Sequence, residues 1–177
     1  YANNNFLANK TGYGLEAQEI AIIVVLRHLA TPFAFTDDIW AKYGEALSEI
    51  IEFQNPATKT APEVNLYNSR AAGMSLTNRG VTISSLVEKN VQFAVCGSAM
   101  RFLANAIAQR TKGDADAIYK EFAANLVPNS HVAPAGVVAG GSDARTLGRR
   151  GPLEQHEAAE RGRVGAAPRH FDAEACV

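Results

Sequence analysis

The sequence has few cysteines and almost no net charge, and it has no long apolar run. Its two cysteines, Cys96 and Cys176, form no Cys-x-x-Cys pair, so neither a disulfide framework nor a zinc site is indicated. A formal net charge of −1, with acids and bases interspersed, gives no basic surface for nucleic acid and no polybasic anchor for a membrane. The longest apolar run, residues 20–26, is far too short to span a bilayer. We therefore expect no nucleic-acid and no membrane partner.

Motifs for nucleotide, phosphate and serine chemistry are also absent. Gly12 and Gly14 precede a predicted strand, whereas a dinucleotide-binding loop follows one. Residues 96–100 do not match the Gly-x-Ser-x-Gly elbow of serine hydrolases. Arg101 follows Cys96 one position too early for the phosphate loop of cysteine phosphatases. We accordingly predict that the protein needs neither a metal nor an organic cofactor.

The apolar pattern predicts an α/β fold. With 177 residues and 47% hydrophobic content, the chain can bury a core of ordinary size. A continuous, β-branched run at 20–26 is typical of a strand buried on both faces, as in a parallel sheet. Helices alternating with strands predict a layered, mostly parallel sheet flanked by helices. The expected strands are 20–26, 91–95 and 135–139, and the expected helical stretches are 36–43, 46–53, 83–89, 99–109 and 114–125.

Cys96 stands between the predicted strand 91–95 and the predicted helix 99–109. Unpaired backbone N–H groups and the positive end of the helix dipole favour a thiolate there. Gly97 would let the sulfur of a partner approach closely, and the N–H groups of Ser98 and Ala99 would stabilise the anion. The same pattern suits a buried, inert cysteine, and the exposure of the thiol decides between the two interpretations.

Two histidines and one long connection are further candidates for function. His28 and His131 lie on the carboxyl side of predicted strands, where open α/β sheets place their ligands. Either histidine could pair with a Cys96 thiolate, although loop histidines are more often hydrogen-bonded surface groups. The turn-rich connection at 54–68 is longer than most loops in compact domains, and it suits a functional lid or a merely solvated loop.

The segment Val91-Gln92-Phe93-Ala94-Val95-Cys96-Gly97-Ser98-Ala99-Met100, preceded by 86–90, resembles the DsrE/DsrF-like family of sulfur-relay proteins. Those proteins show a similar helix, a short turn, a hydrophobic strand and a cysteine at the next helix. The strand at 20–26, the segment at 38–43 and a strand at 132–139 fit the same layout. The resemblance covers residues 1–139. It implies flavodoxin-like layering without the expected first strand, a homo-oligomer, and a Cys96 that carries sulfur as a persulfide.

The two ends of the chain depart from this pattern. Tyr1 is not a methionine, and residues 2–6 read as the frayed end of an element whose beginning is missing. Residues 140–177 contain six arginines, no lysine and six glycines, which predicts a poorly ordered tail in place of a closing helix. A sulfur relay would be cytoplasmic, whereas an upstream export signal would place the protein in the periplasm.

Three functions fit these observations. The first is a DsrE-like sulfur relay that uses Cys96 and has a protein sulfur donor or acceptor as partner. The second is a non-catalytic oligomeric or small-ligand-binding module with an inert cysteine. The third is a peroxide- or thiol-sensing role in which Cys96 forms a sulfenic acid.

Overall fold

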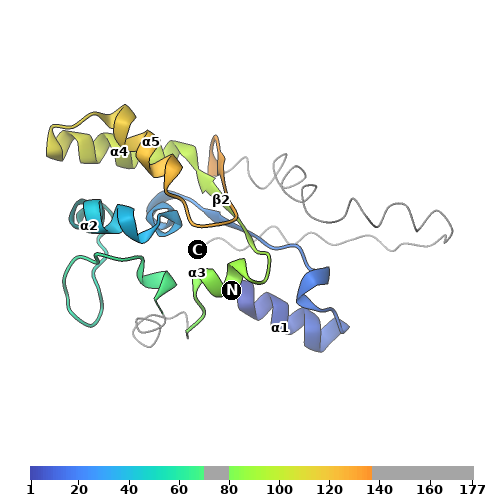
Figure 1. The fold of residues 1–177 in the computed structure, drawn as a ribbon. Coiled ribbons are helices and arrows are strands. Elements are labelled where there is room, and N and C mark those ends of the chain that lie inside the picture. Colours follow the sequence, from blue (N-terminus) through green and yellow to red (C-terminus); the bar gives the residue numbers. More distant parts are fainter. Residues whose placement is uncertain (70–79, 137–177) are drawn as a thin grey trace.

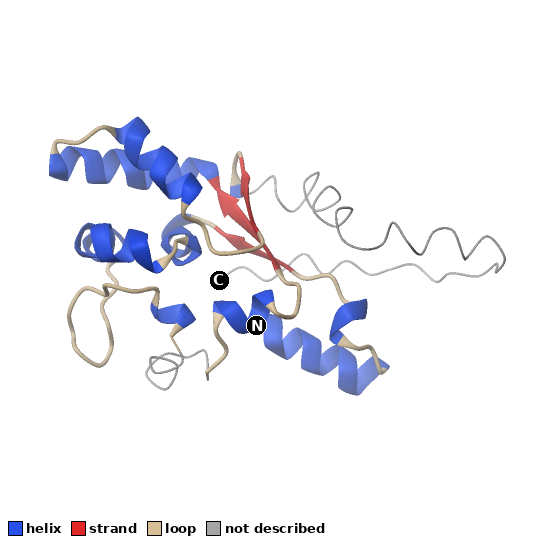
Figure 2. Cartoon of the chain, in the orientation of Figure 1, coloured by secondary structure: helices blue, strands red, loops and turns tan. Residues whose placement is uncertain are grey.

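The computed structural model describes residues 1–69 and 80–136, and in them three strands form a parallel sheet with flanking helices (Figures 1 and 2). The strands are β1 (Ile23–Leu26), β2 (Gln92–Cys96) and β3 (Ser130–Ala133), in the order β1-β2-β3. The α-helices are α1 (Ala2–Tyr13), α2 (Asp37–Ile51), α3 (Ile83–Val87), α4 (Gly97–Thr111) and α5 (Ala115–Ala124). Short 3₁₀ helices span Ala17–Glu19, His28–Ala34 and Leu66–Asn68. The predicted layered α/β fold with a parallel sheet is confirmed.

The helices pack on one face of the sheet. Alternate residues of β1 and β2 point to this face. They pack with helix side chains in two large apolar clusters, to which the strands contribute Val24, Leu26, Phe93 and Val95. On the other face a small apolar cluster consists of Ile23, Val25, Ala94 and Ala133. Within the described part of the chain, this cluster contains no helix residue. The connections β1-to-β2 and β2-to-β3 each lead to the adjacent strand, and both run in the same direction across the sheet. Because such crossovers are right-handed, they bring their helices to the same face.

The larger cluster is centred on α2, α4 and the 3₁₀ helix His28–Ala34. Trp40 is fully enclosed, and its indole N–H donates to the carbonyl of Pro32 at 3.1 Å. Phe35 stacks on Phe122 of α5 with ring centroids 4.4 Å apart. The apolar positions of α4 recur every three to four residues and are buried. In α5 only Ile118 and Phe122 are buried, whereas Ala117 and Ala123, which share the apolar pattern in the sequence, are exposed.

The connection after α2 is fastened to the core. Asn65 is 1% exposed, and its side-chain amide donates to the carbonyls of Phe33 and Phe35 at 2.8 and 2.9 Å. The ring of Tyr67 contacts that of Phe33, with centroids 4.6 Å apart. Gly44 of α2 lies directly under the Pro62 carbonyl. Because the buried Asn65 amide and the Tyr67 ring anchor it, the segment 62–67 packs on the core and is not free to move as a lid would.

Several predicted elements differ from those observed. The first strand begins at Ile23, three residues later than predicted, and its residues are half-buried because β1 is an edge strand of the described sheet. The two predicted helical stretches at 36–43 and 46–53 are one helix, α2, which continues through Gly44. The expected frayed segment 2–6 belongs to α1.

The predicted third strand, whether 135–139 or 132–139, is also wrong in position. The observed β3 is Ser130–Ala133, which begins before either predicted strand. Pro134 follows it directly and has no N–H to donate to a further ladder bond. Pro134 and Ala135 bend the chain, and Gly136 is the first residue assigned to a helix; residues 134–136 are called the turn below. Residues 137–139 lie outside the described residues, as does the tail at 140–177.

Candidate functional site

Cys96 is both the last residue of β2 and the N-cap of α4, as the sequence predicts. Its Sγ accepts hydrogen bonds from the backbone N–H of Ala99 at 3.4 Å and of Gly136 at 3.2 Å. The residue is 7% exposed. Donors aimed at the sulfur stabilise negative charge on it. Burial, in contrast, limits the access of a reagent to the sulfur. The hydrogen-bond donors are thus typical of a nucleophilic cysteine, and the low exposure is typical of a structural one.

The turn formed by Pro134, Ala135 and Gly136 lies next to the sulfur. The backbone N–H and the hydroxyl of Ser98 both donate to the Pro134 carbonyl, at 3.2 and 2.9 Å. The Ser98 N–H is therefore directed to the turn and not to Cys96. The second N–H donor to the sulfur comes from Gly136, forty positions away in the chain.

Gly97 permits close packing of β3 against the start of α4. A Cβ at this position would lie 3.1 Å from the Ala133 carbonyl oxygen and 3.2 Å from the Val132 Cγ1. The side of Gly97 on which a Cβ would stand is therefore filled by the end of β3. A side chain here would press against the adjacent strand, which favours glycine.

Arg27 joins this edge of the sheet from β1. It follows Leu26, which pairs with Val95, so Arg27 comes next in register beside Cys96. Its aliphatic stem lies against Gly136, where an added Cβ would be 2.8 Å from the Arg27 Cβ. Sequence reasoning missed the contributions of Arg27 and Gly136. The available signal for Arg27 was its position as the first charged residue after an apolar strand.

Neither histidine hydrogen-bonds to the sulfur. His28 is exposed at the start of a 3₁₀ helix, with a left-handed φ of 51°. His131 is exposed within β3 and pairs with Ala94, while Cys96 pairs with Ala133. The His131 Nε2 lies 3.2 Å from the Gln92 Oε1. Of the predicted supporting residues, Gly97 and Ser98 therefore lie beside Cys96. In the described chain, the hydrogen bonds to the Cys96 sulfur come from backbone N–H groups.

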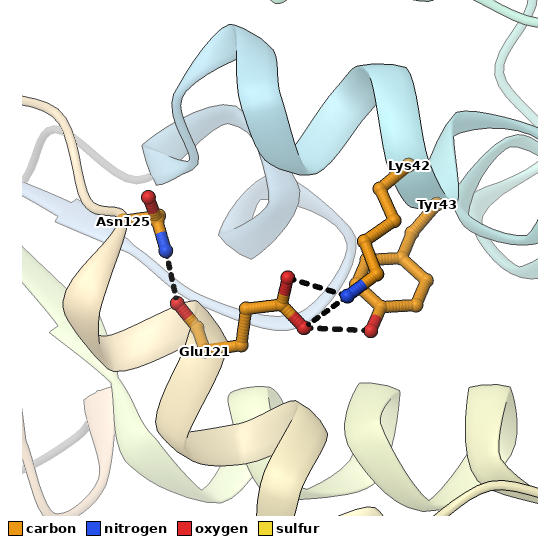
Figure 3. A network of polar contacts seen from close by, with 4 residues as sticks. All are labelled: Lys42, Tyr43, Glu121 and Asn125. Atoms are coloured by element: carbon orange, nitrogen blue, oxygen red, sulfur yellow. Dashed lines mark hydrogen bonds and ion pairs between the residues drawn. The ribbon is translucent and has the colours of Figure 1, made fainter.

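A second polar cluster ties α2 to α5 (Figure 3). The Lys42 ammonium contacts both carboxylate oxygens of Glu121, at 2.7 and 2.8 Å, and the Tyr43 hydroxyl donates to one of them at 2.7 Å. The Asn125 amide donates to the Glu121 backbone carbonyl at 2.8 Å. Sequence reasoning did not anticipate this cluster, because it joins residues nearly eighty positions apart.

Charge and burial act together on these groups. Burial raises the pKa of the Glu121 carboxyl, but the hydrogen bonds from Lys42 and Tyr43 outweigh it, and the net pKa is lowered. The hydrogen bond to Glu121 raises the pKa of Lys42. Burial, followed by the hydrogen bond to Glu121, raises the pKa of Tyr43. Each group is held in its neutral-pH form, so the cluster stabilises the α2–α5 contact and is not poised to exchange protons near neutrality.

An open depression of about 520 Å³ runs along α2, and it contains none of the residues around Cys96. Its lining residues are Glu45, Ser48, Glu49, Glu52, Gln54 and Ala61. Within residues 1–69 and 80–136, no cluster of three or more His, Cys, Asp or Glu residues could hold a metal ion. In the same residues, no helix has the length and apolar character needed to cross a membrane.

Comparison of the chain with protein-family models, with curated protein sequences and with solved structures finds no match. The resemblance to DsrE/DsrF-like proteins therefore stays a prediction from the residues around Cys96.

Proposed function

We propose that this protein is a sulfur carrier of the DsrE-like type, in which the Cys96 thiolate accepts sulfane sulfur and passes it on as a persulfide. The observation that carries the proposal is the pair of backbone N–H groups, from Ala99 and Gly136, directed at the sulfur. Both donors belong to the fold, so they would already be in place when negative charge forms on Cys96. The position of the cysteine between β2 and α4 supports the same role.

The transfer would be a balanced exchange between sulfur atoms. The Cys96 thiolate attacks the outer sulfur of a donor persulfide, R–S–SH. A new S–S bond forms to Cys96 while the S–S bond of the donor breaks, and the donor leaves as the thiolate R–S⁻. The transferred sulfur keeps its proton, and no external oxidant or reductant is consumed. Passing the sulfur to an acceptor thiolate repeats the exchange, which agrees with a donor or acceptor protein as partner.

Intact-mass analysis tests this proposal. The full chain carrying Cys176→Ser, so that only Cys96 reports, is incubated with a low-molecular-weight hydropersulfide and then desalted. We expect a gain of one sulfur atom that is reversed by an acceptor thiol. The matched control carries Cys96→Ala in the same background. No gain by the Cys96 protein, or an equal gain by the control, would refute the proposal.

The 7% exposure of Cys96 favours a second candidate function. In it the protein is a non-catalytic, oligomeric or small-ligand-binding module, and Cys96 is a small apolar residue of the sheet edge. This candidate predicts that Cys96 reacts with iodoacetamide only after global unfolding. It also predicts a stable homo-oligomer whose mass, measured by light scattering, is unchanged in Cys96→Ala.

A further inference from the structure

We infer that the turn Pro134-Ala135-Gly136 is a clasp over Cys96, and that Ser98 fastens it. The clasp would control access to the sulfur by opening locally while the rest of the fold stays intact. With respect to sulfur transfer, this inference rests on the function proposed above. With respect to access by any thiol reagent, it depends only on the geometry at the carboxyl end of β2.

The clasp is held at two points. At Pro134, the carbonyl accepts two hydrogen bonds from Ser98, one from the backbone N–H and one from the hydroxyl. At Gly136, the last described residue, the N–H donates to the Cys96 Sγ. The stem of Arg27 lies against Gly136 at the same end. These contacts hold the turn beside a sulfur that belongs to a residue only 7% exposed.

The Ser98 hydroxyl is the part of this attachment that one side-chain substitution removes. Ser98 is an exposed residue, and its hydroxyl contributes one of the two hydrogen bonds to Pro134. The turn follows the last residue of an edge strand in the described sheet, so the paired residues of β3 need not separate when it moves. Segments with few buried apolar contacts are those that open locally at a low free-energy cost. Opening would withdraw the Gly136 N–H and uncover the sulfur, while the Ala99 N–H at the start of α4 would stay with it.

Native-state alkylation of Cys96 tests the clasp. The full chain carrying Cys176→Ser is treated with iodoacetamide at increasing urea concentrations below the unfolding transition. For local opening we expect a labelling rate that hardly depends on urea, because little surface is exposed. If the labelling rate rises with the full urea dependence of equilibrium unfolding, Cys96 is released only by global unfolding and the clasp is refuted.

Substitutions at Ser98 test how the clasp is fastened. Loss of one hydrogen bond in Ser98→Ala should raise the labelling rate without urea about fivefold. Ser98→Thr keeps the hydroxyl and should restore the slow rate. Ser84→Ala is the matched control, because it removes an exposed hydroxyl that bonds to Asn68. Ser84 lies in α3, which precedes β2, whereas Cys96 is the last residue of β2. Equal rates in Ser98→Ala and Ser84→Ala would overturn the assignment.

A second variant acts on the other end of the turn. In Gly136→Ala the new Cβ would stand 2.8 Å from the Arg27 Cβ, which is fixed to the backbone and cannot rotate away. The turn must shift, and we expect faster labelling even if Ser98→Ala does not fold. Unchanged labelling of a folded Gly136→Ala would count against the clasp. Rapid labelling with no sulfur gain would refute the carrier function alone, whereas sulfur gain with labelling that follows global unfolding would refute the clasp alone.

Discussion

Replacing Gly44 with alanine tests whether the connection after α2 lies directly on that helix. A Cβ at position 44 would stand 2.1 Å from the Pro62 carbonyl oxygen and 3.3 Å from its carbon. Both are backbone atoms, so no side-chain rotation relieves the contact. Alanine in place of a helical glycine stabilises by about 1 kcal/mol on its own. Overpacking that displaces backbone costs about 1–3 kcal/mol. Because the approach is so short, we expect the cost to prevail, with a net loss of about 1–2 kcal/mol.

Equilibrium unfolding in urea, followed by the fluorescence of the single tryptophan, Trp40, measures this change. Gly12→Ala is the matched control, since Gly12 lies in α1 and an added Cβ would meet no atom within 4 Å. It should be neutral or stabilise by up to about 1 kcal/mol. If Gly44→Ala stabilises the protein as much as Gly12→Ala does, the connection does not rest on α2 and the reasoning is refuted.

Three further outcomes are expected. Asn65→Ala should lower the free energy of unfolding by about 2–3 kcal/mol, because buried carbonyls lose their donors, and a loss no larger than that of a surface Asn→Ala change would contradict this. Trp40→Phe should cost about 1–2 kcal/mol by urea unfolding followed by circular dichroism, because the Pro32 carbonyl loses its donor. The lowered pKa of Glu121 means that its ionised form stabilises the fold above the unfolded value of about 4.5, and that this contribution is lost as the pH falls through the folded pKa. The stability difference between the native chain and Glu121→Gln should therefore shrink below pH 4.5, and a difference that stays constant there would contradict the Lys42 pairing.

The sequence predicted the helices better than the strands. In α4 and α5 the apolar residues recur at the helical period over more than two turns, so the pattern is long enough to be recognised. Strand β3 has only four residues and includes Ser130 and His131, which carry no strand pattern. Its place is set by pairing with β2, and the apolar run that follows Pro134 misled the prediction.

Only those residues of the candidate site that are close to Cys96 in the sequence could be predicted. The apolar strand, Cys96 and the following helix lie within one short stretch, and their junction was identified correctly. The Gly136 donor and the Arg27 stem reach the same place through the pairing of three strands, and nothing near Cys96 in the sequence indicates either. Neither histidine hydrogen-bonds to the sulfur, for a related reason. A position on the carboxyl side of a strand tells at which edge of the sheet a residue lies. The direction in which its side chain points depends on the exact residue at which the strand ends.

The order of the strands accounts for the closed surroundings of Cys96. In open α/β sheets a ligand crevice forms at the carboxyl ends of the strands, where two neighbouring connections leave for opposite faces. In the described part of this chain both connections pack on the same face, so the segments that follow β1, β2 and β3 are not drawn apart. The turn after β3 therefore meets Cys96 and Ser98 directly, and the 520 Å³ depression lies elsewhere, along α2. If Cys96 carries sulfur as proposed, a donor would reach it by displacing this turn, and the opening of the turn would be the step on which transfer depends.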